Sequence, residues 1–384
     1  MRGPNIKMRN FMRVDSMTNN SVILECNEIL NTIPTTRYQG SKRKILPWLY
    51  ECIKSYEFNT VLDAFGGSGV VSYLFKQMGK RVTYNDLFLF NQLIGESIVE
   101  NNRTLLTNND VDFVLTSNGN GNTFITDNFH GIYYLDDENK WLDRVIGNII
   151  SLDTLYEGRK LRHKKAIAYN ALFQSCLAKR PYNLFHRRNL EMRTRDVERG
   201  FGNKATWDKP FAEHFRGFVK EINDAVFFSP EACRAICQDV FDIRTGHYDL
   251  VYLDPPYLKN RGEGNESSDY LRCYHFLEGI ARYDEWAKII ERETLNRRIA
   301  ATFAPNYFKA SGALEVFERL IKKFRGSIIV LSYRYGGTPT IDELSEIMRK
   351  YKGHLDVYDR HYKYALNKQN GDAALNREYL LIGY

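Results

Sequence analysis

Four consecutive residues late in the chain have the types needed for chemistry on an amino group. Asp254, Pro255, Pro256 and Tyr257 follow the apolar run at residues 250–253. A short apolar run of this kind predicts a buried strand, so the four residues would stand at its end. A carboxylate, a rigid carbonyl pair and an aromatic face together suit the methylation of an exocyclic amine on a nucleobase.

That amine is a poor nucleophile because its lone pair is delocalised into the ring. Asp254 and the Pro255 carbonyl would accept both amino protons and favour the pyramidal nitrogen that gains charge in the transition state. The two prolines have fixed φ angles and no N–H, so the turn is stiff. Tyr257 would stack on a base flipped out of a duplex. The alternative is a strand followed by an ordinary proline turn with a packed tyrosine.

A glycine-rich turn far upstream favours the chemical interpretation. Residues 61–71, VLDAFGGSGVV, predict a buried strand, a turn and the start of a helix. This arrangement brings a nucleotide-like ligand against bare backbone amides. Residues 81–86 predict a second strand, which ends at Asp86, at about the spacing where a carboxylate meets ribose hydroxyls in a Rossmann-like unit.

The turn could bind either a dinucleotide or S-adenosylmethionine. Gly67-Ser68-Gly69 followed by Ser72 nearly matches the dinucleotide pattern G-x-G-x-x-G/A, with serine at the third small position. A pyrophosphate would need cations or further helix amides nearby, whereas Asp63 precedes the turn and suits the ammonium of a methionine-like group. S-adenosylmethionine is therefore favoured over a dinucleotide.

Four stretches in a fixed order make the chain resemble the Dam-type, or alpha-group, family of adenine-N6-specific DNA methyltransferases. They are YQGSK from Tyr38, DAFGGSG from Asp63, NDLF from Asn85 and DPPY from Asp254. In that family the cofactor motif precedes the target-recognition region and the catalytic motif follows it. The resemblance covers residues 37–384, although the middle third of this range matches the family only in its general sequence character and not in motifs.

The resemblance implies roles for individual residues. Tyr38 and Lys42 would lie by the methionine end of the cofactor, and Asp86 would hold its ribose. Asp239 would accept a hydrogen bond from the amino group of the cofactor's adenine. The residues expected to bind S-adenosylmethionine are Tyr38, Lys42, Asp63, Phe65, Gly66, Gly67, Gly69, Asp86, Asp239 and Val240. The residues expected to be catalytic are Asp254, Pro255, Pro256 and Tyr257.

The composition indicates a globular protein with two domains or one large insertion. The chain has 384 residues, of which 43% are hydrophobic. No apolar run approaches the roughly 18 residues that would span a bilayer. The start, MRGPNIKMRN, lacks the apolar centre of a secretory signal. We expect a cytoplasmic protein with no membrane partner.

The six cysteines favour no metal site. Cys233 and Cys237 would share one face of a helix, but no matching His or Cys pair follows them. Free thiols in a reducing cytoplasm are the expectation.

Positive charge is concentrated in one stretch. Lys and Arg exceed Asp and Glu by seven over the chain, and residues 178–220 alone hold eleven Lys/Arg against five Asp/Glu. Aromatic residues alternate with these cations, as on surfaces that follow phosphates and touch bases. A solvated helix face is the alternative, but the stretch falls where the family inserts its DNA-reading element. The residues expected to contact double-stranded DNA are Lys179, Arg180, Arg187, Arg188, Arg193, Arg195 and Lys204.

Alternating strand and helix patterns predict an α/β fold. We expect a Rossmann-like methyltransferase fold with an open, doubly wound, mostly parallel sheet, to which the family adds an antiparallel last strand. Residues 1–36 would form an N-terminal arm, 37–92 and 237–384 the catalytic cofactor-binding domain, and 93–236 an inserted, mainly helical target-recognition domain.

Several local predictions accompany this architecture. Helices are expected at 42–56, 89–98, 164–177 and 284–293, and further strands at 299–303, 327–333 and 378–382. The charged segment 259–269 would be either a lid over the flipped base or a plain surface loop. Ser332 and Tyr333 would either contact the target base or belong to a glycine turn with a buried tyrosine.

The expected activity is methyl transfer from S-adenosylmethionine to N6 of a flipped adenine in double-stranded DNA. A restriction-modification or related DNA-marking system is the expected setting, with a cognate restriction endonuclease as a partner that the sequence leaves open. A cytosine-N4 methyltransferase is the alternative among enzymes, because the same acceptors suit any exocyclic base amine. A DNA-binding subunit without transfer activity is the alternative from another class, and the four residues Asp63, Asp86, Asp254 and Tyr257 argue against it.

Overall fold

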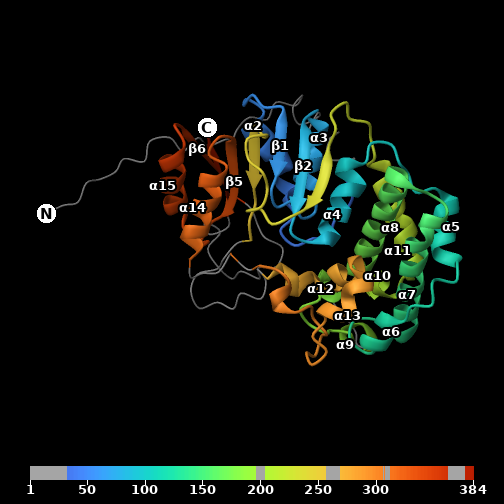
Figure 1. Cartoon of the computed structure of the whole chain (residues 1–384). Coiled ribbons are helices and arrows are strands. Elements are labelled where there is room, and N and C mark those ends of the chain that lie inside the picture. Colours follow the sequence, from blue (N-terminus) through green and yellow to red (C-terminus); the bar gives the residue numbers. More distant parts are fainter. Residues whose placement is uncertain (1–32, 196–203, 257–268, 306, 308–311, 362–376) are drawn as a thin grey trace.

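The computed structural model describes residues 33–195, 204–256, 269–305, 307, 312–361 and 377–384. Within these residues, seven strands form one sheet with the order β3-β2-β1-β4-β5-β7-β6 (Figure 1). The strands are β1 (Thr60–Asp63), β2 (Arg81–Asp86), β3 (Arg234–Cys237), β4 (Leu250–Leu253), β5 (Ile328–Arg334), β6 (Leu355–His361) and β7 (Arg377–Gly383). β7 runs antiparallel to β5 and β6, and the other neighbouring pairs are parallel. The mostly parallel sheet with an antiparallel last strand is confirmed.

Helices cover both faces of this sheet. They are α2 (Leu46–Ile53), α3 (Val70–Gln77), α4 (Leu89–Gly95), α14 (Ala313–Lys323) and α15 (Ile341–Tyr351), with the 3-10 turns η1 (Lys42–Ile45) and η7 (Ala301–Phe303). Because β1 and β4 are buried on both faces, their residues alternate between two cores. Val61 and Tyr252 pack in the core shared with α2 and α3, whereas Leu62 and Val251 pack in the core shared with α14 and α15.

The register brings three acidic residues to one edge of the sheet. β1 lies between β2 and β4, with Asp63 opposite Tyr84 on one side and Tyr252 on the other. All three strands run in the same direction, so Asp63, Asp86 and Asp254 come at or just after carboxyl ends that point the same way. Ligands of open α/β sheets bind at this edge.

A helical layer lies beside the β3 edge of the sheet (Figure 1). Its helices are α5 (Asn108–Thr116), α6 (Phe124–Asn128), α7 (Asp136–Ile150), α8 (Gly158–Ala178), α9 (Glu191–Thr194), α10 (Lys204–Asp208), α11 (Phe211–Asp224), α12 (Tyr270–Ala281) and α13 (Trp286–Ile289), with the 3-10 turns η3 (Ser151–Thr154), η4 (Pro181–Asn183) and η6 (Tyr283–Glu285). α8 packs against α11 and against α4, which connects the layer to the sheet.

Two of these helices come from the part of the chain that follows the proline turn. Phe276 of α12 packs against Phe129 and Phe185, with ring centroids 5.0 Å apart in both pairs. Trp286 of α13 lies 5.0 Å from Phe129. Residues 270–289 therefore pack within the helical layer, although we expected them in the catalytic domain.

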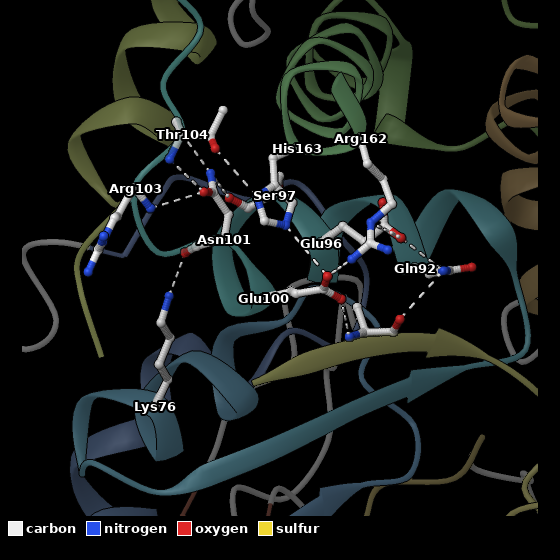
Figure 2. A network of polar contacts seen from close by, with 11 residues as sticks. Lys76, Gln92, Glu96, Ser97, Glu100, Asn101, Arg103, Thr104, Arg162 and His163 are labelled. Atoms are coloured by element: carbon white, nitrogen blue, oxygen red, sulfur yellow. Dashed lines mark hydrogen bonds and ion pairs between the residues drawn. The ribbon is translucent and has the colours of Figure 1, made fainter. Parts of the chain in front are cut away.

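A polar network joins the edge strand β3 to the helical layer (Figure 2). The π-helix η2 (Glu96–Glu100) continues α4, and its last residue supplies the connection. Glu100 Oε2 accepts a hydrogen bond of 2.9 Å from the Ala235 amide in β3, while Glu100 Oε1 forms an ion pair with Arg162 of α8. The network thus covers an open strand edge and fastens it to α8.

Most of the predicted helices and strands are confirmed, two differ, and one strand was not predicted. Residues 299–303 are not a strand: Ile299 makes one isolated antiparallel bridge, with Ile290, and η7 follows. The helix expected over 284–293 ends at Ile289. β6, which is half-buried at the sheet edge, was not predicted because it lacks a clear apolar alternation.

Candidate active site

A cavity of about 200 Å³ lies at the carboxyl ends of β1, β2, β3 and β4. Seven separate stretches of chain line it: the 38–42 segment, the turn after β1, the end of β2, the segment after β3, the turn after β4, the first turn of α12 and the 301–307 segment. The expected site residues among its lining are Tyr38, Lys42, Asp63, Phe65, Gly66, Gly67, Asp86, Asp239, Val240, Asp254 and Pro256. The glycine turn and the aspartate after β4 therefore share one cavity.

Other expected residues lie elsewhere. Gly69 does not line the cavity: it begins α3 with φ 74°, and a Cβ there would lie 3.2 Å from Ile98. Its left-handed conformation makes the turn possible. Pro255 is outside the lining, between two residues that belong to it. Tyr257 lies outside the described residues, as does the 259–269 segment apart from Asp269, which caps α12.

The glycine turn is shaped by a tyrosine beneath it. The Tyr84 hydroxyl donates a hydrogen bond of 2.8 Å to the Gly67 carbonyl. A Cβ on Gly66 would come within 2.1 Å of the Tyr84 ring, and one on Gly67 within 3.1 Å of the Tyr38 ring. Glycine is thus required here by internal packing, a cause that the sequence pattern alone did not indicate.

Asp63 presents a carboxylate oxygen to the cavity. Its Oδ2 accepts a 2.7 Å hydrogen bond from the Ser72 hydroxyl, while Oδ1 is buried and has no hydrogen-bond partner among the described residues. Burial raises the pKa of Asp63 to about 7; the Ser72 hydrogen bond opposes this shift, and Asp254 adds to it. A buried acid without a full set of donors would gain most from a cationic ligand.

Asp86 supports the turn from the end of β2. Its Oδ2 accepts from the Gly67 amide and its Oδ1 from the Phe88 amide, both at 3.0 Å. Burial raises the pKa of Asp86, and the hydrogen bonds it accepts act in the opposite direction. Asp86 is therefore fixed in place with its carboxylate in the cavity wall.

Asp239 and Tyr307 meet at the other side of the cavity. Asp239 Oδ1 accepts from the Phe241 amide at 2.9 Å, and Oδ2 accepts from the Tyr307 hydroxyl at 2.7 Å. Both residues line the cavity together with Val240. Tyr307 was not among the expected site residues because it stands in no motif and comes far after Asp239 in the sequence.

A buried ammonium group connects the proline turn to the last strand. Lys42 Nζ lies 2.8 Å from Asp254 Oδ1, 2.7 Å from Asp254 Oδ2 and 3.6 Å from Glu378 Oε1 of β7. The side chains of Lys42 and Glu378 are 4% and 0% exposed. Burial alone would lower the pKa of Lys42, but Asp254 and Glu378 raise it above its ordinary value. Lys42 is therefore a charged partner of Asp254, a contact that the resemblance did not imply.

Ser332 completes this chain of contacts. Its hydroxyl donates a 2.6 Å hydrogen bond to Glu378 Oε1, and the side chain is buried. Tyr333 is buried as well, and a Cβ on Gly337 would lie 2.6 Å from its ring. Of the two interpretations given for this segment, the structure favours the glycine turn with a buried tyrosine.

A column of aromatic rings forms the wall next to Lys42. Tyr38 stacks on Tyr274, with centroids 4.7 Å apart and an interplanar angle of 4°, and on Tyr270, at 5.8 Å and 22°. The Tyr274 hydroxyl accepts from the Gln39 amide at 2.7 Å. Tyr270 and Tyr274 escaped notice in the sequence because their helix follows a charged segment and carries no motif.

The sequence also matches a protein-family model over residues 38–290, and this family is described as D12 class N6 adenine-specific DNA methyltransferase. The chain belongs to this family. Membership makes the protein a DNA methyltransferase acting on adenine N6, and it confirms the predicted activity and resemblance at the level of the D12 class. It also disfavours the cytosine-N4 alternative and the subunit without transfer activity.

Relatives of this D12 class protein carry related names. It is 27% identical to Type II methyltransferase M2.HphI of Haemophilus parahaemolyticus, over 88% of this chain and 94% of the relative. It is 23% identical to Type II methyltransferase M.NlaIII of Neisseria lactamica, over 85% of this chain and 91% of the relative. Modification methylase LlaI of Lactococcus lactis subsp. lactis is 24% identical over 87% of this chain, which spans 52% of that relative.

The D12 class chain buries some of the cations expected on its DNA surface. Lys179 and Arg193 both pair with Glu138, at 2.9 Å for Lys179 and at 2.9 and 2.7 Å for the two Arg193 nitrogens. Their side chains are 3% and 6% exposed. Burial disfavours the predicted contact of these two residues with DNA, because both side chains hold the helical layer together.

Arg180 is also a structural residue. Its guanidinium is buried and donates to the carbonyls of Leu184, Arg187 and Arg188, with Nη1–Arg188 and Nη2–Arg187 distances of 2.6 Å. It lies 4.6 Å from the centre of the Tyr133 ring. The predicted contact of Arg180 with DNA is disfavoured in the same way, since its donors are turned inward and fix the loop at 184–188.

The other four expected cations of the D12 class chain lie at the surface. Arg187 and Arg188 stand on the loop that Arg180 holds, and Arg195 and Lys204 are exposed beyond it. Tyr182 precedes this loop with 59% of its side chain exposed and φ 62°, an uncommon conformation for tyrosine.

The part of the chain that the structure describes shows neither a metal site nor a membrane span. No group of three or more His, Cys, Asp or Glu residues there could hold a metal ion, and the described cysteines are free thiols. None of the described helices has the length and apolar character needed to cross a bilayer.

Proposed function

We propose that the chain transfers a methyl group from S-adenosylmethionine to N6 of an adenine flipped out of double-stranded DNA. The observation that carries this proposal is that Asp63, Asp86, the glycine turn and Asp254 line one cavity. Methyl donor and acceptor could then meet within one cavity, which provides the proximity that direct transfer requires.

The residues present suit this cofactor. The unpartnered Oδ1 of Asp63 would accept from the ammonium of the methionine group. Asp86 would bind the ribose, and Asp239 with Val240 would hold the adenine, while Tyr307 keeps the Asp239 carboxylate aimed at the cavity. When bound, S-adenosylmethionine supplies an activated methyl group on its sulfonium.

Cofactor affinity should depend on pH through Asp63. Because its pKa is raised to about 7, the carboxyl group is mostly protonated below that pH and cannot attract an ammonium. Affinity should therefore fall as pH decreases from 7.5 to 5.5, by up to about tenfold per unit once pH is below 7. Isothermal titration calorimetry over this range would measure it.

Asp63→Asn is the matched control for this prediction. The variant should bind the cofactor weakly at pH 7.5 and show little change between pH 7.5 and 5.5. If it kept the pH dependence of the unaltered protein, a group other than Asp63 would be responsible.

At the target end, this chain's own groups orient the amine. Asp254 and the Pro255 carbonyl would accept its two protons and stabilise the positive charge that develops on nitrogen. Lys42 fixes the Asp254 carboxylate by touching both of its oxygens. Tyr257 would stack on the flipped base, and after transfer the surplus proton would leave to solvent.

The exposed part of the basic stretch supports duplex binding. We propose that residues 93–236 carry most of target recognition, with Arg187 and Arg188 on phosphates or base edges, and that Arg195 and Lys204 extend this surface. Arg180 orders the 184–188 loop in the free protein, so less conformational entropy would be lost when DNA binds.

Replacing Arg187 and Arg188 together by alanine should weaken DNA binding and flatten its salt dependence by roughly one unit of slope per lost phosphate contact. Binding isotherms at several salt concentrations would show it. Lys322→Ala with Arg325→Ala is the control, because these exposed cations lie at the other end of the sheet, before β5 begins. An equal loss of slope in both pairs would contradict the assignment.

The relatives' names, which include the words modification and Type II methyltransferase, support a place in a restriction-modification system. A cognate endonuclease would then share the recognition sequence. The deciding experiment is expression in a host free of adenine methylation, followed by modification-sensitive sequencing of its genome. We expect N6-methyladenine within one short sequence. A genome without it would overturn the proposal.

A further inference from the structure

A small hairpin in the helical layer presents a leucine to solvent. The Leu295 hairpin (residues 290–299) is closed by the bridge between Ile290 and Ile299 and by a 2.8 Å hydrogen bond from the Glu291 amide to the Arg298 carbonyl. Its tip residue, Leu295, has 79% of its side chain exposed, more than any other exposed large hydrophobic residue of the described chain. An apolar side chain that is so exposed on a hydrogen-bonded hairpin indicates a site that binds a partner.

The hairpin is rigid, so the exposure of Leu295 is not a consequence of a loose loop. The Arg298 guanidinium pairs with Glu291 at 2.7 Å across its base. Thr294 Oγ1 donates to the Glu291 carbonyl at 2.8 Å and accepts from the Arg298 amide at 3.1 Å. Arg297, next to the tip, has φ 51°, which an arginine rarely adopts. Several contacts thus hold the leucine outward.

The same hairpin is fastened to the loop that carries Arg187 and Arg188. Asn296 Nδ2 donates to the Phe185 carbonyl at 3.3 Å. The Tyr133 hydroxyl lies 2.7 Å from that carbonyl and 3.0 Å from the Asn296 carbonyl, which fixes the two loops side by side. The two loops therefore form one continuous surface.

This surface lies on the side of the molecule to which the parallel strands point. In Figure 1 the hairpin after α13 projects below the helical layer near α9, and α12, whose first turn lines the cavity, lies above it. Arg292 precedes the leucine and Arg297 follows it, with Glu293 between Arg292 and the leucine. A leucine between arginines, next to the proposed phosphate contacts, has the chemistry of an apolar wedge for duplex DNA.

We propose that the Leu295 hairpin is a second DNA-contacting element, in which Leu295 packs against a base step and Arg297 against the phosphates beside it. The proposal rests on the proposed DNA surface and adds an element from the part of the chain after the proline turn. Partial unstacking at that step would ease extrusion of the target adenine, because a base that has lost a stacking neighbour is cheaper to flip.

Leu295→Ala and Arg297→Ala test this with a duplex that carries the methylated sequence found in the host genome, with 2-aminopurine in place of the target adenine. For Leu295→Ala we expect a lower fluorescence gain on binding and a dissociation constant raised about tenfold, with the salt slope unchanged. For Arg297→Ala we expect the slope to fall by about one unit.

Leu155→Ala is the control, since Leu155 is also 51% exposed but precedes the first turn of α8, whereas the Arg180 loop follows its last turn. The hairpin would not be a DNA-contacting element if Leu295→Ala bound the duplex and flipped the target base like the unaltered protein. The same conclusion would follow if the variant changed only the sedimentation of the free protein. These outcomes are distinct from failure of the proposed function, which would appear as an unmethylated genome with the unaltered protein.

Discussion

Replacing Asp254 by alanine should lower methyl transfer by about a thousandfold or more while cofactor binding changes little. Asp254 is one of two acceptors proposed for the target amine, and its carboxylate is held at the target end of the cavity by Lys42. Its contribution is greatest when the nitrogen gains positive charge, so its loss should appear in kcat. The cofactor contacts proposed at the glycine turn do not involve it.

Single-turnover methyl transfer to DNA and calorimetric cofactor titration would separate the two effects. Asp254→Asn is the sharper variant, because it keeps the size of the side chain and removes the charge. We expect it to be nearly as inactive as the alanine variant. Retained transfer in either one would remove Asp254 from the mechanism.

The second large effect should come from Lys42. Lys42→Met leaves the Asp254 and Glu378 carboxylates inside the protein without their shared cation, and breaking such a buried arrangement is costly. Transfer should fall by about a hundredfold, and the melting temperature should fall with it. Lys42→Arg keeps the positive charge, so it should retain part of the transfer activity and part of the thermal stability.

A double-mutant cycle would assign this effect to the buried charges. Adding Glu378→Gln to Lys42→Met removes the second carboxylate, so thermal stability should recover in part, whereas transfer should stay low because Asp254 is still not held. The cofactor dissociation constant of Lys42→Met is the decisive control. A large increase in it with an unchanged kcat would place Lys42 at the methionine end of the cofactor, as the resemblance implied, and not behind Asp254.

The sequence predicted the main elements of this site because each depends on local chemistry. Asp63 and Asp254 follow strongly apolar runs, and parallel strands that meet in the middle of a sheet must bring their carboxyl ends together. The fold class, the glycine turn and the cavity shared by both acids follow from that pattern. Gly69 shows the limit of this reasoning, since a glycine of the motif can be needed for the conformation of the turn without contacting the ligand.

Contacts between distant segments could not be predicted in this way. Glu378 reaches Lys42 only because β7 inserts beside β5 in the antiparallel direction, and Tyr307 meets Asp239 across a long stretch of sequence. The roles of the basic residues could not be predicted for the same reason, because they depend on which side chains the fold buries. A count of charge cannot tell Arg180, whose donors bind carbonyls inside the protein, from Arg187, which stands on the loop that those carbonyls form.

The packing of α12 and α13 has a practical consequence for exchanging sequence specificity between relatives. The segment between β2 and β3 is not a self-sufficient cassette, because Phe276 and Trp286, which come after β4, complete its interior. A chimera that transplanted only the earlier segment would set foreign side chains against both aromatic residues. Workable grafts would need to carry two separate pieces of polypeptide, with splice points placed within the sheet.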